Sequence, residues 1–106
     1  MPTIVYGFLT RVDRDDHFQN HEHEFDPPFA SAEEYEEAGI AFLTARPTRA
    51  IMEAVRRNGD LVRYSPLSNE FAICDRDGIL LTYYKPNPLV HREPDNVTYF
   101  RKQSLK

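Results

Sequence analysis

The chain has 106 residues, of which 41% are hydrophobic and 28% are charged. We expect a single domain over residues 1–106, because this length supports one hydrophobic core. No stretch approaches the ~20 apolar residues that a membrane-spanning helix needs, so no membrane partner is expected, and no secretion signal opens the sequence. Cys74 is the single cysteine, which excludes an internal disulfide and a cysteine-rich zinc site.

The net charge of −4 is distributed unevenly. Residues 1–45 carry two arginines and ten acidic residues, a balance of −8. Residues 46–106 carry eight arginines, three lysines and seven acidic residues, a balance of +4. Since the guanidinium fork matches phosphate geometry, the second half is where we expect a polyanion such as nucleic acid to dock.

Two helices are predicted in the acidic half. Residues 1–10 favour an extended or irregular lead-in, and a helix over residues 12–24 ends before two consecutive prolines. The second helix covers residues 32–45, where apolar residues recur at helical spacing. A capping box starts it: the Ser31 hydroxyl accepts from an early backbone N–H, and Glu34 reaches back to the Ser31 amide.

A four-stranded antiparallel meander is predicted after these helices. Asn58-Gly59 is the strongest short hairpin signal, with positive φ expected at both residues. The four short apolar runs, the first of which is also compatible with helix, are Ile51–Arg56, Leu61–Tyr64, Glu70–Cys74 and Ile79–Tyr84. Cys74 is expected to be a small buried hydrophobe within its strand.

The C-terminal part is predicted as a loop over residues 86–95 followed by a short helix. Prolines favour the loop, and Asp95 or Asn96 can cap a helix that continues through Tyr99 and Phe100. The predicted fold class is therefore α+β: N-terminal helices packed on a four-stranded antiparallel β-meander, with a short C-terminal helix.

His17 and His21 are the first candidate site, because residues four apart share one helix face. One interpretation is acid–base catalysis, since an unperturbed imidazole titrates near pH ~6.5. A second is a zinc pair, for which Glu22 and Glu24 are the available third ligands. The third is a solvated polar helix face. We rank acid–base catalysis above metal binding, because the sequence shows no clear third ligand for zinc.

The predicted sheet offers a second candidate site. Strand alternation places Leu61 and Arg63 on one side and Val62 and Tyr64 on the other. The cations that can form a basic face here are Arg56, Arg57, Arg63, Arg76 and Lys85. The rings on which bases can stack are those of Tyr64, Tyr83 and Tyr84. The alternative is an ordinary solvent-facing sheet whose tyrosines are half-buried.

Small polar residues near the strand ends complete the candidates. Ser68, Asn69 and Thr82 can bond phosphate oxygens, or Ser68 and Asn69 can satisfy a turn while Thr82 simply suits a strand. Lys85 stands at the end of the last predicted strand and is the first lysine in the chain.

Taken together, five segments resemble the C-terminal ribonuclease domains of bacterial polymorphic and contact-dependent inhibition toxins, in the barnase–EndoU–colicin–RelE-like group. These segments are D-H-F-x-x-H-x-x-E-F (Asp16–Phe25), S-A-E-E-Y-E-x-A (Ser31–Ala38), R-N-G-D-x-V-R-Y-x-P-x-S-N-E-F (Arg57–Phe71), D-G-I-x-x-T-Y-Y-K-P (Asp77–Pro86) and Y-F-x-x-Q (Tyr99–Gln103). The resemblance covers residues 16–103. It implies cleavage of RNA, often tRNA, without a metal or other cofactor, by attack of the 2′-hydroxyl on the adjacent phosphorus to give a cyclic phosphate.

This resemblance assigns roles to the candidates. His17 and His21 are expected to be base and acid in an undetermined order, with Lys85 stabilising the charge on phosphorus and Thr82 donating a hydrogen bond to phosphate. The expected substrate contacts are Arg56, Arg63, Ser68, Asn69 and Tyr84. The alternative function is a non-catalytic binding module, a degenerate relative of these toxins, that uses a basic sheet face to bind RNA or an acidic protein partner.

The resemblance also implies a cellular location, a route of delivery and a protein partner. Such a toxin acts in the bacterial cytoplasm, reaches it as part of a larger delivery protein, and has a cognate immunity protein with an acidic surface.

Overall fold

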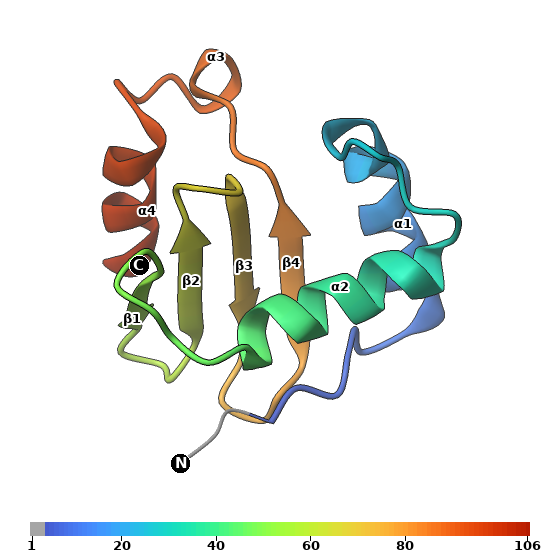
Figure 1. Ribbon diagram of the computed structural model, residues 1–106. Helices are drawn as coiled ribbons and strands as arrows, with labels where there is room; N and C mark the ends of the chain where they lie inside the picture. Colours follow the sequence, from blue (N-terminus) through green and yellow to red (C-terminus); the bar gives the residue numbers. More distant parts are fainter. Residues whose placement is uncertain (1–3) are drawn as a thin grey trace.

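The computed structural model describes residues 4–106 (Figure 1). Residues 1–3, the start of the predicted lead-in, lie outside the described part. The elements in chain order are α1 (Arg11–His21), the 3-10 turn η1 (Glu22–Glu24), α2 (Ala32–Thr44), β1 (Met52–Val55), β2 (Leu61–Ser65), β3 (Glu70–Cys74), β4 (Leu80–Tyr84), α3 (Pro88–His91) and α4 (Asn96–Ser104). The predicted α+β class, with N-terminal helices, four strands and a C-terminal helix, is confirmed.

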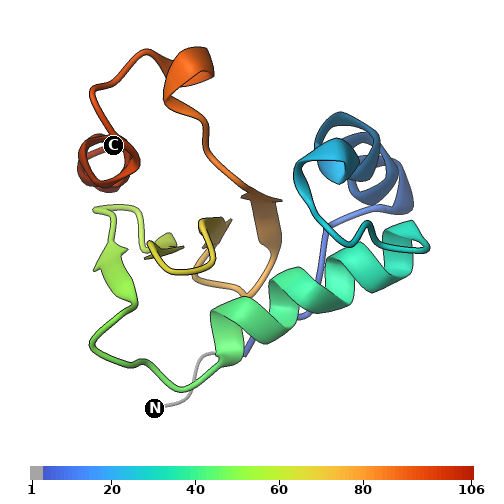
Figure 2. The same cartoon turned by 45° about the horizontal axis from the view of Figure 1, so that its top comes forward.

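The sheet is an antiparallel meander in the order β1-β2-β3-β4, as predicted. Helix α2 lies along one face, α4 lies on the other, and α1 stands beside the β4 edge (Figures 1 and 2). The predicted alternation in β2 is confirmed, because Leu61 packs in the α2-side core and Val62 and Tyr64 pack in the α4-side core.

Each face of the sheet has its own core. Tyr35, Leu43 and Tyr83 fill the core under α2, and the Tyr35 hydroxyl donates to the backbone carbonyl of Tyr83, which ties α2 to β4. Val62, Phe71 and Phe100 pack together in the core under α4. Cys74 is buried as predicted, and burial raises the pKa of its thiol to about 11.

The segment before α1 is attached to the start of β4. The Tyr6 N–H donates to the Gly78 carbonyl at 2.8 Å, and the Leu80 N–H donates to the Gly7 carbonyl at 2.8 Å. Gly7 has a φ of +124°, and a Cβ there would lie 2.8 Å from a carboxylate oxygen of Glu36, so glycine fits where a side chain would not. From residue 4 onward, the lead-in therefore fixes where α1 begins relative to the sheet.

The predicted helix starts are confirmed, with two local differences. Thr10 caps α1 by accepting from the Asp13 N–H at 3.1 Å, and the last turn of the predicted 12–24 helix is the 3-10 turn η1. Ser31 caps α2 as predicted. Glu34 reaches back to the Ala30 N–H, one residue before the amide that the capping box predicted.

Two loop predictions are corrected. The segment 86–95 contains the short helix α3, because Asn87 caps it and Pro88 occupies its first position, where proline costs no hydrogen bond. In the hairpin between β1 and β2, Gly59 has a φ of +96° while Asn58 does not adopt positive φ. The Arg56 N–H donates to the Asp60 carbonyl at 2.8 Å and closes this longer turn.

Within residues 4–106, no helix has both the length and the apolar character that crossing a membrane requires.

Candidate functional site

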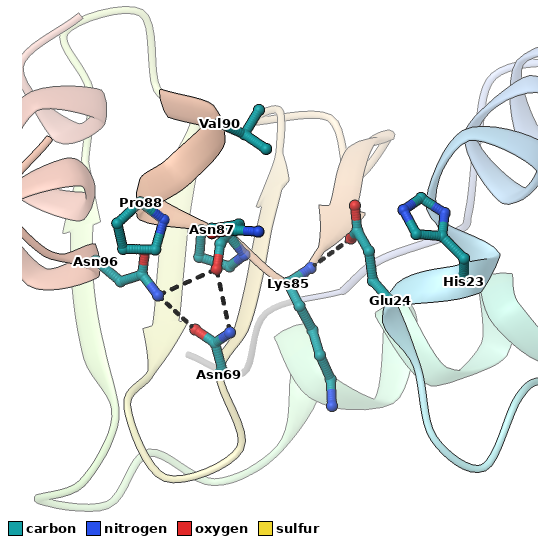
Figure 3. Close-up of a pocket in the computed structure, with 9 residues that line it drawn as sticks. His23, Glu24, Asn69, Lys85, Asn87, Pro88, Val90 and Asn96 are labelled. Carbon is teal, nitrogen blue, oxygen red and sulfur yellow. Dashed lines mark hydrogen bonds between the residues drawn. The ribbon is translucent and has the colours of Figure 1, made fainter. Parts of the chain in front are cut away.

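Two adjoining cavities lie between η1 and α3, at the end of β4. The larger has a volume of about 470 Å³ and the smaller of about 110 Å³. The residues that line both are Glu24, Lys85, Pro86, Asn87 and Val90. Figure 3 shows the two walls of the larger cavity, with His23 and Glu24 from η1 facing Asn87, Pro88 and Val90 across it.

His21 and Glu24 form a hydrogen-bonded pair at this site. The His21 Nδ1 lies 2.8 Å from Oε2 of Glu24, and the other oxygen, Oε1, accepts the backbone N–H of Lys85 at 2.9 Å. A carboxylate is acceptor-only, so Nδ1 carries the proton, and the lone pair of a neutral imidazole is on Nε2. The His21 ring stacks on Tyr84 at 5.0 Å between centroids, which fixes its plane. This is the geometry of an oriented proton-transfer group.

His17 lies one turn before His21 on the same face of α1, as predicted. Its ring stacks between Phe8 at 5.0 Å and His21 at 6.1 Å. Its Nδ1 is buried without a hydrogen-bond partner in the described part of the chain. Burial, and then the nearby charge of His21, lower the pKa of His17. His17 lines a separate cavity of about 360 Å³, so the two imidazoles are neighbours without sharing one recess.

His91 belongs to the site, although the sequence did not single it out. It lines the smaller cavity together with His21, and its ring stacks on Tyr99 at 4.1 Å. Its Nδ1 accepts the Glu93 N–H at 3.1 Å, and its Nε2 lies 2.7 Å from Oδ1 of Asn96. The Tyr84 and Tyr99 hydroxyls are hydrogen-bonded to one another between the two imidazoles.

The four histidines of the chain therefore gather around one region. His21 and His91 line the smaller cavity, His23 lines the larger one, and His17 stacks on His21. Nothing in the sequence around His91 indicated a functional site, because His91 lies in the segment 86–95, which lacks helical or strand periodicity and was predicted as a loop.

The backbone N–H of Lys85 contacts Glu24 at the site, while the side-chain ammonium group of Lys85 points away from the site. The Nζ atom lies 5.4 Å from the centroid of the Phe25 ring and points away from Glu24 and His23 (Figure 3). Strand alternation explains this, because Lys85 follows Tyr84 and so projects to the opposite side. Thr82 shares the Tyr84 face, since Thr82 and Tyr84 pair with Ile73 and Phe71 of the α4-side core.

The predicted basic sheet face does not form, because its two central arginines serve the fold. Arg63 is 2% exposed; it donates to Glu53 and to the carbonyls of Phe42 and Ala45, at 2.7 and 2.8 Å, at the end of α2. Arg56 donates to the Gln103 carbonyl at 2.8 Å. Neither guanidinium is presented as the predicted substrate contact.

Asn69 also satisfies internal groups. Its Nδ2 donates to the Pro86 carbonyl at 3.1 Å, and its Oδ1 accepts from the Tyr64 hydroxyl and from Asn96, both at 2.9 Å (Figure 3). Its φ of 56° is the left-handed conformation that asparagine tolerates in turns. Ser68 is exposed in the same β2–β3 turn. The amide of Asn69 thus joins this turn to the segment after β4.

Among residues 4–106, no group of three or more His, Cys, Asp or Glu side chains is arranged to hold a metal ion. The geometry thus gives no support to the zinc interpretation of His17 and His21.

No protein-family model matches this sequence, and no curated protein matches it at a significant level.

Proposed function

We propose that this protein is an endoribonuclease that cleaves RNA by attack of a ribose 2′-hydroxyl on the neighbouring phosphorus. The observation that carries the proposal is His21, whose imidazole is held between the Glu24 carboxylate and the Tyr84 ring at the edge of a small cavity. The resemblance of five ordered sequence segments to bacterial toxin ribonucleases supports the same chemistry.

The proposed reaction needs a base, an acid and charge stabilisation. His21 Nε2 takes the 2′-hydroxyl proton, the 2′-oxygen bonds to phosphorus, and the bond from phosphorus to the 5′-oxygen breaks. The leaving 5′-oxygen takes its proton from the imidazolium of His17, whose ring stacks on that of His21 at 6.1 Å. The products are a 2′,3′-cyclic phosphate and a 5′-hydroxyl.

Thr82 and Lys85 complete the proposed site. Thr82 lines neither cavity, but it shares the strand face of Tyr84, and its hydroxyl is proposed to donate to a phosphate oxygen from there. The Lys85 ammonium approaches the phosphorus after rotation of its four-carbon side chain away from Phe25.

One observation favours a second candidate, a binding module without catalysis. The Lys85 ammonium lies over the Phe25 ring and His17 lines a separate cavity, so the groups that the reaction needs do not converge on one recess. This candidate predicts binding of RNA that weakens steeply with salt and leaves the RNA intact.

The test is incubation of the purified protein with total tRNA in EDTA. We expect the wild type to produce 2′,3′-cyclic phosphate ends, and His21→Ala and Lys85→Ala to cut slowly or not at all. Gln19→Ala, an exposed position on α1, is the control and should cut like the wild type. Intact RNA from the wild type, or equal cutting by all variants, would contradict the proposal.

A further inference from the structure

The larger cavity extends beyond the smaller one and is larger than proton transfer at phosphorus requires. Its volume of about 470 Å³ lies in the range of ~300–1,000 Å³ that is usual for small-ligand sites. The smaller cavity beside His21, of about 110 Å³, has room for the reacting phosphate but not for a whole nucleotide. Because the two cavities share five lining residues, one nucleotide can extend from the smaller into the larger.

The larger cavity contains one side-chain amide with unused hydrogen-bonding capacity. The side-chain amides of Asn69 and Asn96 are hydrogen-bonded to one another, and both donate to the Pro86 carbonyl (Figure 3). Asn87 uses only Oδ1, which accepts the Leu89 N–H at 2.9 Å and caps α3. Within residues 4–106, its Nδ2 takes part in no side-chain hydrogen bond, and Oδ1 keeps a second lone pair.

The two walls of this cavity suit a flat aromatic ligand. Val90, 78% exposed, offers an apolar surface from α3. Across the cavity stands the exposed imidazole ring of His23 from η1 (Figure 3). A nucleobase between them can pack on an apolar group and stack on a ring, the arrangement by which single-stranded nucleic acids are bound.

We infer that the larger cavity binds the nucleobase next to the cleaved phosphate, and that Asn87 determines which base is preferred there. A side-chain amide offers one donor and one acceptor to a base edge. A base can enter between Val90 and His23 only when it is unpaired and unstacked, so the substrate is RNA that is single-stranded at the cleavage position. This inference rests on the proposed function, and its test separates the two.

The probes are DNA oligonucleotides that contain a single ribonucleotide, so that only the bond on its 3′ side can be cleaved. They are made in all sixteen combinations of the two bases that flank this bond, which are the base of the ribonucleotide and the base that follows it. We expect the wild type to prefer one base at one flanking position by on the order of tenfold. Asn87→Ser should remove this preference, while its hydroxyl still caps α3 and the melting temperature stays near that of the wild type. Leu89→Ala, the 88% exposed neighbour of Val90 outside both cavities, is the matched control and should keep the preference.

The outcomes distinguish the two proposals. Cleavage without a base preference, or with the same preference in Asn87→Ser, overturns the base site and leaves the ribonuclease standing. If the wild type cleaves neither these probes nor tRNA, the ribonuclease fails, and the base site is judged by binding of the all-deoxy oligonucleotides. Binding that depends on the flanking base and is lost in Asn87→Ser supports the site; binding that ignores the base overturns it.

Discussion

His21 and Glu24 are three residues apart and belong to different elements, yet His21 Nδ1 lies 2.8 Å from Oε2 of Glu24. The change from the α-helix α1 to the 3-10 turn η1 falls between them. Glu24 is held in turn by the backbone N–H of Lys85, 61 residues later in the chain. A contact between near neighbours is thus fixed by a long-range bond to the end of β4.

Glu24→Gln should lower the cleavage rate by roughly 10- to 100-fold, because groups that orient a functional imidazole contribute at about this level. Glutamine still accepts the Lys85 N–H but lacks the negative charge opposite the His21 Nδ1–H. The measurement is kcat on RNA, with circular dichroism to verify the fold. Glu22→Gln, exposed in the same turn, is the control, and equal rates for the two variants would contradict an orienting role for Glu24.

Lys85→Met separates the charge of Lys85 from its packing. Methionine can still cover the Phe25 ring, so we expect the urea midpoint to change little, while loss of the ammonium lowers kcat. The measurements are single-turnover cleavage and urea unfolding of the same preparation. An unchanged rate would show that Lys85 acts in the fold alone, through its contact with Phe25.

Arg63→Ala should destabilise the protein by ~1–3 kcal/mol, because it leaves the Phe42 and Ala45 carbonyls at the end of α2 without their donor. Urea unfolding measures this loss. Arg57→Ala, at an exposed position, is the matched control and should change the unfolding free energy by less than ~0.5 kcal/mol. A stable Arg63→Ala protein with a selectively raised KM would restore the predicted substrate contact.

His17 should make the protein less stable in mild acid. Its pKa in the folded state is lowered, mainly by burial, so below pH 6.5 the unfolded chain binds more protons at this residue than the folded protein does. The contribution is therefore fully present above pH 6.5 and is lost as the pH falls through the lowered pKa. His17→Gln should flatten the fall in urea midpoint between pH 7 and pH 5.

The exposed His23 supplies the comparison for that experiment. His23→Gln should retain the slope of the wild type. If His17→Gln and the wild type lose stability in parallel, the buried imidazole does not contribute to the acid sensitivity.

The order of the elements could be predicted from local signals. Ser31 and Asp95 mark the starts of α2 and α4, because a side-chain oxygen at those positions satisfies an early backbone N–H. The turn residues between apolar runs mark the strands of the meander. Such signals act over a few residues, so they can be read along the chain.

The roles of the arginines could not be predicted in this way. Arg63 on an alternating strand is compatible with solvent or with the interior, and the decision came from α2, whose last carbonyls need a donor on that face of the sheet. Arg56 likewise meets the carbonyl of Gln103, 47 residues later. Sequence spacing carries no information about which carbonyl will lie opposite a strand.

Local sequence patterns were enough to predict the α+β class, the meander and the shared helix face of His17 and His21, because helical and strand periodicities and capping groups depend on neighbouring residues. Three relationships came from the packing of distant segments: His91 joins His21, the Lys85 ammonium turns to Phe25, and Glu24 is held at the end of β4. Those relationships depend on how helices from both ends of the chain pack against the two faces and the edge of one twisted sheet, and that packing is set by the whole core.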